Sequence, residues 1–152
     1  MVNPKLLRDK YAAELTFNLN RFVEEGAIAG SPSLSREIPD SAQVLQMITG
    51  GYQAATGVYS ATEEAMMAFA AQYSKFEIEK YDELVLELSA DFMNLHNGLY
   101  VVNLSGNDSI ECSLEPPVFD RPAKELIEKS NIYVMNVNFS FGNVDFFLAE
   151  KI

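Results

Sequence analysis

Two long stretches of the chain repeat apolar residues every three or four positions, which is the spacing of one helix face. The first covers residues 6–25 and follows Asn3 and Pro4, a pair typical of a helix N-terminus. The composition of residues 30–33 predicts a loop after it. The second stretch begins at Asp82 and continues through residue 94 to residue 103. Its apolar row, which we expect to be buried, is Leu84, Leu88, Phe92, Leu95 and Leu99.

Between these helices the pattern changes to that of a β-hairpin. Residues 42–49 and 52–60 are strand candidates, and the Gly50-Gly51 pair between them allows the positive φ angles of a tight turn. Ser60 and Glu63 then form the spacing of a capping box. This signature predicts a third helix, rich in Ala and Met, that ends near residue 73.

The C-terminal third carries a second hairpin. Residues 110–114 predict a short strand, and residues 121–130 predict one short helix. Residues 132–139 alternate apolar and polar side chains, as a half-buried strand does. The Gly142-Asn143 pair then turns the chain into a last strand over residues 144–150.

The predicted order is therefore helix, hairpin, helix, followed by helix, strand, hairpin. Each half opens with a long helix and continues into antiparallel strands, so the chain has the pattern of a loose internal duplication. We expect one α+β domain over residues 1–152, with an antiparallel sheet on which the long helices pack.

Composition narrows the classes of partner. The chain has 152 residues, 11 basic and 22 acidic, for a formal net charge of −11. This balance argues against nucleic acid and against an anionic membrane surface, because both bind basic side chains. The single cysteine, Cys112, excludes an internal disulfide and a Cys-rich zinc site, and it favours a reducing, cytoplasmic setting. No apolar run approaches the length of a membrane span.

Most catalytic motifs are absent from the sequence. There is no GxxxxGK[ST] or GxGxxG loop, so nothing indicates a nucleotide site. His96 is the only histidine and falls inside the second long helix, where a structural role is the simpler interpretation. One histidine also excludes metal sites built on several, and we expect no metal or cofactor of the protein's own.

A polar row on the second long helix is the most informative feature. Glu87, Asp91, Asn94 and Gly98 follow at spacings of four, three and four, so they share one helix face. That face differs from the face of the apolar row. Taken alone, such a row is typical of a solvated helix surface. It also places a carboxylate and a carboxamide one turn apart, next to a residue without a side chain.

The segment Asp91-Phe-Met-Asn94-Leu-His-Asn-Gly98 resembles the signature helix of the CheC/CheX family of chemotaxis phosphatases. That signature is an acidic residue, two further residues, Asn, and Gly four positions later. The stretches Val44-Leu-Gln-Met-Ile-Thr-Gly-Gly51 and Gly57-Val-Tyr-Ser60 resemble the CheX hairpin in content and order. The similarity covers residues 40–105, and the remaining elements agree in type and order.

The resemblance implies a phosphatase that acts on the aspartyl phosphate of a response-regulator receiver domain. It implies that Asn94 orients the attacking water and that Asp91 pairs with a lysine of the receiver. Glu87 and Gly98 would contribute to the docking surface, with Gly98 letting the two surfaces meet. The receiver would supply Mg²⁺. The resemblance also implies a homodimer.

Two departures from the family pattern leave other functions open. The family commonly has Glu where this chain has Asp91, one methylene shorter, and the first helix has Glu14 without an Asn at the required spacing. The second departure leaves one candidate site per chain, as in CheX. A module that binds a receiver without hydrolysis is one alternative. Another is a dimerisation domain whose C-terminal strands extend a sheet across two chains.

Overall fold

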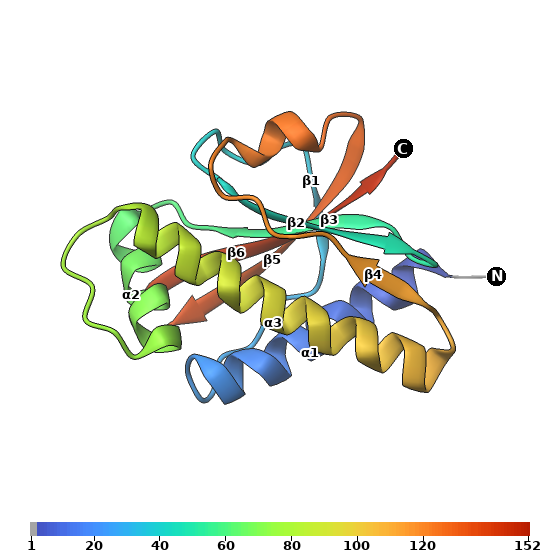
Figure 1. The fold of residues 1–152 in the computed structure, drawn as a ribbon, viewed down its shortest axis with the longest axis horizontal. Coiled ribbons are helices and arrows are strands. Elements are labelled where there is room, and N and C mark those ends of the chain that lie inside the picture. The colour runs from blue at the N-terminus through green and yellow to red at the C-terminus, as the bar shows by residue number, and fades with distance from the viewer. Residues whose placement is uncertain (1–2) are drawn as a thin grey trace.

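The structure is a computed structural model that describes residues 3–152 (Figure 1). It contains three α-helices, one 3₁₀ helix and six strands. In chain order these are α1 (Pro4–Phe22), β1 (Ser33–Ser35), β2 (Val44–Gly50), β3 (Ala54–Tyr59), α2 (Glu63–Ser74), α3 (Glu83–Asp108), β4 (Cys112–Leu114), η1 (Ala123–Leu126), β5 (Ser130–Phe139) and β6 (Gly142–Lys151).

The six strands form one antiparallel sheet in the order β1-β5-β6-β3-β2-β4. The sheet has the symmetry expected of a duplication: β1, β2 and β3 of the first half correspond to β4, β5 and β6 of the second half. The short strand of each half pairs with the hairpin of the other half, β1 with β5 and β4 with β2. This confirms both the α+β prediction and the loose internal duplication.

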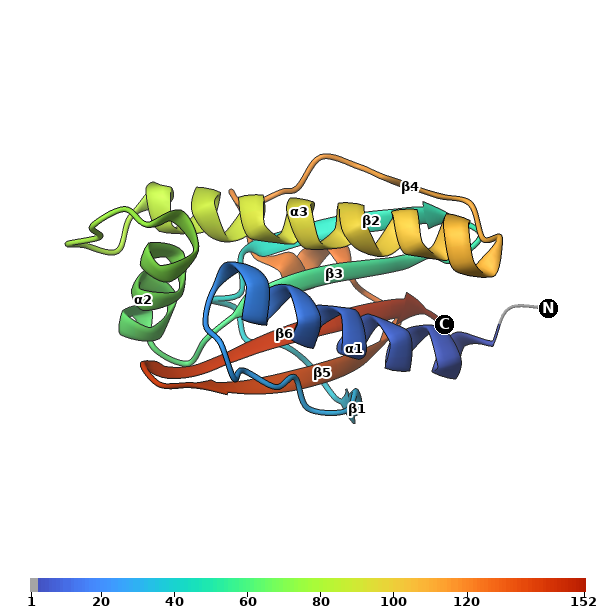
Figure 2. The same cartoon turned by 90° about the horizontal axis from the view of Figure 1, so that it is seen from below.

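Helices α1 and α3 lie side by side, run in opposite directions and cover one face of the sheet, with α2 at one end (Figure 2). The main hydrophobic core fills the space between these helices and the sheet. On the opposite face, η1 and the chain before β2 enclose a smaller core (Figure 1). None of the helices in residues 3–152 has an apolar stretch long enough to cross a membrane.

Local signals in the sequence placed most element ends correctly. The side chain of Asn3 accepts hydrogen bonds from the backbone N–H groups of Lys5 and Leu6, and Asp82 caps α3 in the same way. The first hairpin forms where predicted, and Gly50 has a φ angle of 107°. Its turn is longer than the predicted Gly50-Gly51 pair, because the last paired residues are Ile48 and Ala54 and Gly50 still pairs with Cys112 on β4.

Further local predictions need correction. The turn of the second hairpin lies at residues 140–141, because Gly142 and Asn143 already belong to β6 and pair with β5. Thr62, not Ser60, caps α2, because the Ser60 hydroxyl donates to the backbone carbonyl of Asn143 instead. The loop predicted over residues 30–33 ends at Ser33, where β1 begins, a strand that the sequence did not predict and that pairs with the outer edge of β5. The helix expected in residues 121–130 is the single 3₁₀ turn η1.

The predicted buried row of α3 is wrong for most of its members. Leu84 is 40% exposed, and Leu88, Leu95 and Leu99 are only half-buried, whereas Phe92 is fully buried. The helix is turned by roughly 100°, one residue position, from the predicted orientation. Its buried residues are Val85, Ser89, Ala90, Phe92, Met93, His96, Asn97, Tyr100 and Leu104. Periodicity missed this face because three of its residues are polar and satisfy much of their hydrogen bonding inside the core.

His96 belongs to this core, in agreement with the structural interpretation of the sequence. Its Nδ1 lies 2.9 Å from Nδ2 of Asn18 on α1, and its ring stacks on Phe92. Burial lowers the pKa of His96 to about 3, so the ring is neutral at pH 7.

The C-terminal strands do not form an exposed edge. Strand β6 lies between β5 and β3, and the outer edge of β5 pairs with β1 at residues 132–134 and with Ala29 at Val137, so these positions are not available to extend the sheet as the dimerisation alternative requires. Among the described residues the sheet edges are β1 and β4, each three residues long. The homodimer stays a prediction.

Candidate functional site

The polar row of α3 is on the surface, as predicted. Asp91 and Asn94 are exposed on the same helix face one turn apart, Glu87 is exposed one turn before them, and Gly98 is half-buried one turn after. The intervening residue Met93 points into the core and anchors this part of the helix. The orientation of α3 therefore differs from the predicted one in its buried face, but the candidate site is exposed in both.

The central part of this row borders an open pocket of about 430 Å³. Its other wall is the chain after β4, which contributes Pro117 and Phe119. Two backbone hydrogen bonds between Val118 and Leu45, of 2.8 and 2.7 Å, hold this chain segment against β2. Here the protein has a concave surface with a carboxylate and a carboxamide at its wall.

The Asn94 carboxamide is held from the sheet side. Its Oδ1 accepts a 2.7 Å hydrogen bond from Nε2 of Gln46, which lies on β2 beneath the helix. Gln46 is fully buried, so its side chain has little freedom to move. The sequence signal for Gln46 is a polar residue between the apolar Val44 and Ile48 on the face toward the helix, and such a signal alone does not indicate a role in a site.

The Asp91 carboxylate is held by a different element, helix α2. The hydroxyl of Tyr73 on α2 donates a 2.6 Å hydrogen bond to its Oδ2. Partial burial and this contact with Asp91 raise the pKa of Tyr73 above its usual value, so the hydroxyl remains a donor at neutral pH. Nothing in the sequence indicated this contact, since the two residues meet only through the packing of α2 on α3.

Gly98 has no internal reason to be glycine. Its φ angle is not positive, and a Cβ atom built on it meets no heavy atom within 4 Å. The same is true of Gly106 later in the helix. Because glycine lowers helix stability, its presence beside Asn94 is compatible with a surface that a partner approaches closely.

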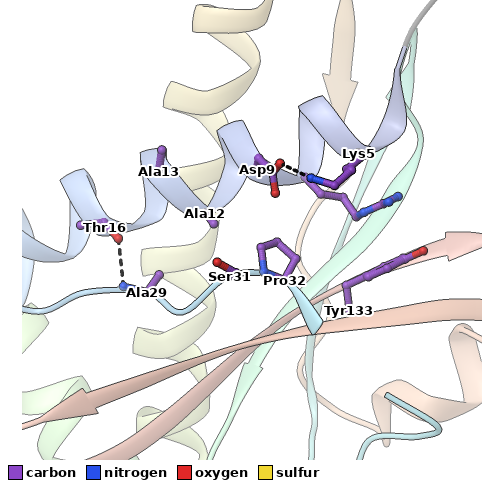
Figure 3. A pocket seen from close by; sticks show the side chains of 10 residues that line it. Lys5, Asp9, Ala12, Ala13, Thr16, Ala29, Ser31, Pro32 and Tyr133 are labelled. Carbon is purple, nitrogen blue, oxygen red and sulfur yellow. Dashed lines mark hydrogen bonds and ion pairs between the residues drawn. The ribbon is translucent and has the colours of Figure 1, made fainter. Parts of the chain in front are cut away.

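A second pocket, of about 510 Å³, lies beside α1 (Figure 3). Its charged side chains are already paired with other protein groups. Lys5 and Asp9 form a 2.9 Å ion pair. Arg8 bonds to Glu150 at 2.6 Å and stacks over the ring of Tyr133 at 4.0 Å. This pocket presents no carboxamide next to an available carboxylate.

The two pockets occupy corresponding places in the duplicated halves. The buried residues of α1 and α3 match at the 78-residue separation that also relates Asn18 to His96. The same separation places Ala13 at the position of Asp91 and Thr16 at that of Asn94. The Thr16 hydroxyl accepts a 2.9 Å hydrogen bond from the backbone N–H of Ala29 (Figure 3).

This register corrects the comparison made with Glu14. Glu14 does not correspond to Asp91: it lies one position further along, and its Oε1 accepts a 2.7 Å hydrogen bond from Asn103 on α3. Ala13 and Thr16 provide neither a carboxylate nor a carboxamide, so α1 has no counterpart of the Asp91–Asn94 pair, and one candidate site per chain stays a prediction. In residues 3–152, no group of three His, Cys, Asp or Glu side chains is placed to hold a metal ion.

No family model matches the sequence, and no curated protein is significantly similar to it. Several solved structures are similar in fold. The chemotaxis protein CheX from Desulfovibrio desulfuricans aligns with a TM-score of 0.74 and 13% identity, over 95% of this chain and 99% of that chain. A chain of the CheX–CheY–BeF3–Mg²⁺ complex from Borrelia burgdorferi aligns with a TM-score of 0.74 and 14% identity, over 93% and 96%.

The same fold extends to a second group of structures. A chain of the FliG–FliM complex from H. pylori aligns with a TM-score of 0.65 and 8% identity, over 97% of this chain and 90% of that chain. Its similarity is lower than that of the two CheX structures. With its six-stranded antiparallel sheet and three α-helices, this protein has the fold of the CheX and CheC-like chemotaxis proteins.

Proposed function

We propose that this protein is a phosphatase that stimulates hydrolysis of the aspartyl phosphate of a CheY-like receiver domain. The observation that carries the proposal is the arrangement on α3. Asp91 and Asn94 are exposed on one face at the wall of a pocket, and each is held by one hydrogen bond from a neighbouring element. A protein of the same fold in a complex with CheY supports a receiver as the partner.

The residue types suit this reaction. Phosphoryl transfer depends mainly on positioning and on stabilising charge, and the receiver brings its own acidic pocket, lysine and Mg²⁺. The neutral carboxamide of Asn94 orients a water in line with the phosphorus without repelling the phosphoryl oxygens. Asp91 pairs with the receiver's lysine, and Glu87 and Gly98 belong to the docking surface.

The direct test is the phosphate lifetime of a phosphorylated receiver from the same genome, measured with and without this protein. We expect the protein to shorten the phosphate lifetime of the receiver even when it is present in much smaller amounts than the receiver. The receiver alone, and the receiver with heat-denatured protein, are the controls. If the protein binds the phosphorylated receiver yet leaves the lifetime unchanged, the phosphatase proposal is wrong.

One observation favours a second function, that of a receiver-binding module without hydrolysis. Asp91 is one methylene shorter than the Glu common in the family, and its Oδ2 is already bonded to Tyr73. The variant Asp91→Glu separates the two functions. A phosphatase keeps or gains activity with the longer side chain, whereas a binding module shows no hydrolysis with either residue.

A further inference from the structure

We infer that Gln46 is a positioning residue for Asn94: it holds the Asn94 side chain in one rotamer and fixes which end of its carboxamide faces the pocket. The consequence for turnover rests on the proposed function, whereas the orientation itself rests on geometry alone. Gln46 lies on β2, fully buried under α3, and makes no contact with a docked partner. Its effect on a reaction is therefore transmitted through Asn94.

A backbone carbonyl decides the orientation of Gln46. The Nε2 atom of Gln46 lies 2.9 Å from the carbonyl oxygen of Glu115, which can only accept a hydrogen bond. The atom facing Glu115 must therefore be the amide nitrogen. The same nitrogen donates at 2.7 Å to Asn94, so the atom of Asn94 that faces it must be Oδ1.

The other end of Gln46 is fixed in the same way. Its Oε1 accepts a 2.8 Å hydrogen bond from Nδ2 of Asn97, which also donates to Thr56 Oγ1 at 2.8 Å. The Thr56 hydroxyl donates to the backbone carbonyl of Gln46, and the Tyr11 hydroxyl donates to Oδ1 of Asn97 at 2.6 Å. Reversing either amide would bring two acceptors or two donors together inside the core, which is costly.

The outward face of Asn94 follows from this network. With Oδ1 turned toward Gln46, Nδ2 points to the pocket as a donor, and one lone pair of Oδ1 remains for a water proton. An exposed asparagine without such a partner samples several rotamers. Gln46 therefore supplies preorganisation, which matters most in the transition state, where small errors in position reduce the rate strongly.

The test compares Gln46→Met with Gln53→Met in the same hairpin. Methionine is close to glutamine in size but makes no equivalent hydrogen bonds, and Gln53 is exposed. The three-bond couplings from Asn94 Cγ to its backbone N and carbonyl C report its χ1 angle by NMR. We expect one rotamer in the parent and in Gln53→Met, and averaged couplings in Gln46→Met.

With a phosphorylated receiver, Gln46→Met should lower turnover at saturating receiver about 10-fold. The receiver concentration for half-maximal rate should change less than twofold, because Asp91 is untouched. Unchanged couplings, or averaged couplings with unchanged turnover, overturn the inference. If the parent itself leaves the phosphate lifetime unchanged, the proposed function fails, and the couplings alone decide the role of Gln46.

A measurement on the parent keeps the inference testable if Gln46→Met does not fold. The side-chain amide protons of Gln46 should exchange with water at least about 100-fold more slowly than those of Gln53, because the Gln46 side chain is buried and both protons are hydrogen-bonded, to Asn94 and Glu115. Equal exchange rates for the two glutamines overturn the inference.

Discussion

The pockets beside α1 and α3 share a scaffold but differ in chemistry. Both lie against the N-terminal part of a long helix, and the buried residues of the two helices match at the same register. Beside α3, Asp91 and Asn94 each use one hydrogen bond to the protein and keep further capacity toward solvent. Beside α1, the corresponding residues are Ala13 and Thr16, and the charged side chains there are paired with other protein groups.

The comparison distinguishes the residues that stabilise the fold from the residues that form a candidate site. The inward residues of both helices build one core, and changing them would cost stability in both halves. The outward residues differ between the two helices. Two of them, Asp91 and Asn94, distinguish the candidate site on α3 from the corresponding surface of α1. A shared fold therefore supports a function only when these outward residues are present as well.

The largest expected difference between the pockets is in turnover. Asn94→Ala should lower stimulated dephosphorylation of a cognate receiver by about 100-fold or more, because it removes the group that orients water. Thr16→Ala, the corresponding change beside α1, should leave turnover within twofold. The measurement is the phosphate-release rate at saturating receiver. Equal losses in the two variants would show that the pockets do not differ as we describe.

The next difference is in docking. Asp91→Ala should raise the receiver concentration for half-maximal rate about 10-fold, close to 1.4 kcal/mol, because one partner of an interfacial ion pair is lost. Asp9→Ala beside α1 breaks an exposed pair with Lys5 and should have no such effect. Titration calorimetry with the receiver gives the affinities. An unchanged affinity for Asp91→Ala would remove this residue from the interface.

A third prediction concerns the contact between the halves, where Asn18 meets His96. The unfolded chain protonates His96 below pH 6.5, but the folded protein does so only near pH 3, so stability is full above 6.5 and falls as the pH drops toward 3. Between pH 6.5 and 5 the loss should reach about 2 kcal/mol. Urea unfolding of the parent and of His96→Gln measures it, and equal pH dependence in both would contradict the prediction.

The smallest expected effect compares two positions on α3 itself. Gly98→Ala and Gly106→Ala should each raise the free energy of unfolding by about 1 kcal/mol, since both positions have room for a Cβ. Only Gly98→Ala should weaken receiver binding, by about threefold, roughly 0.7 kcal/mol. Urea unfolding and calorimetry test the pair. Equal binding of both variants would show that the partner does not approach Gly98.

The sequence by itself determined the order of the elements other than β1, the duplication and the exposed row on α3. These depend on signals carried by neighbouring residues: the cap at Asn3, the turn at Gly50, and the spacing of Asp91 and Asn94. Such signals act within one or two turns of the chain, so a single sequence contains them in full. The apolar row of α3 was the exception, because Ser89, His96 and Asn97 carry polar side chains on the buried face.

Only the tertiary structure decided what surrounds the candidate site. Gln46 is 48 residues away from Asn94 in the chain, and Tyr73 is 18 away from Asp91. The pairing of β2 with β4 brings the chain after β4 to the pocket, and the packing of α2 on α3 brings Tyr73 to Asp91. A hydrogen bond between distant residues leaves no periodic trace in a single sequence, since each partner is polar for a reason that appears only when the chain has folded.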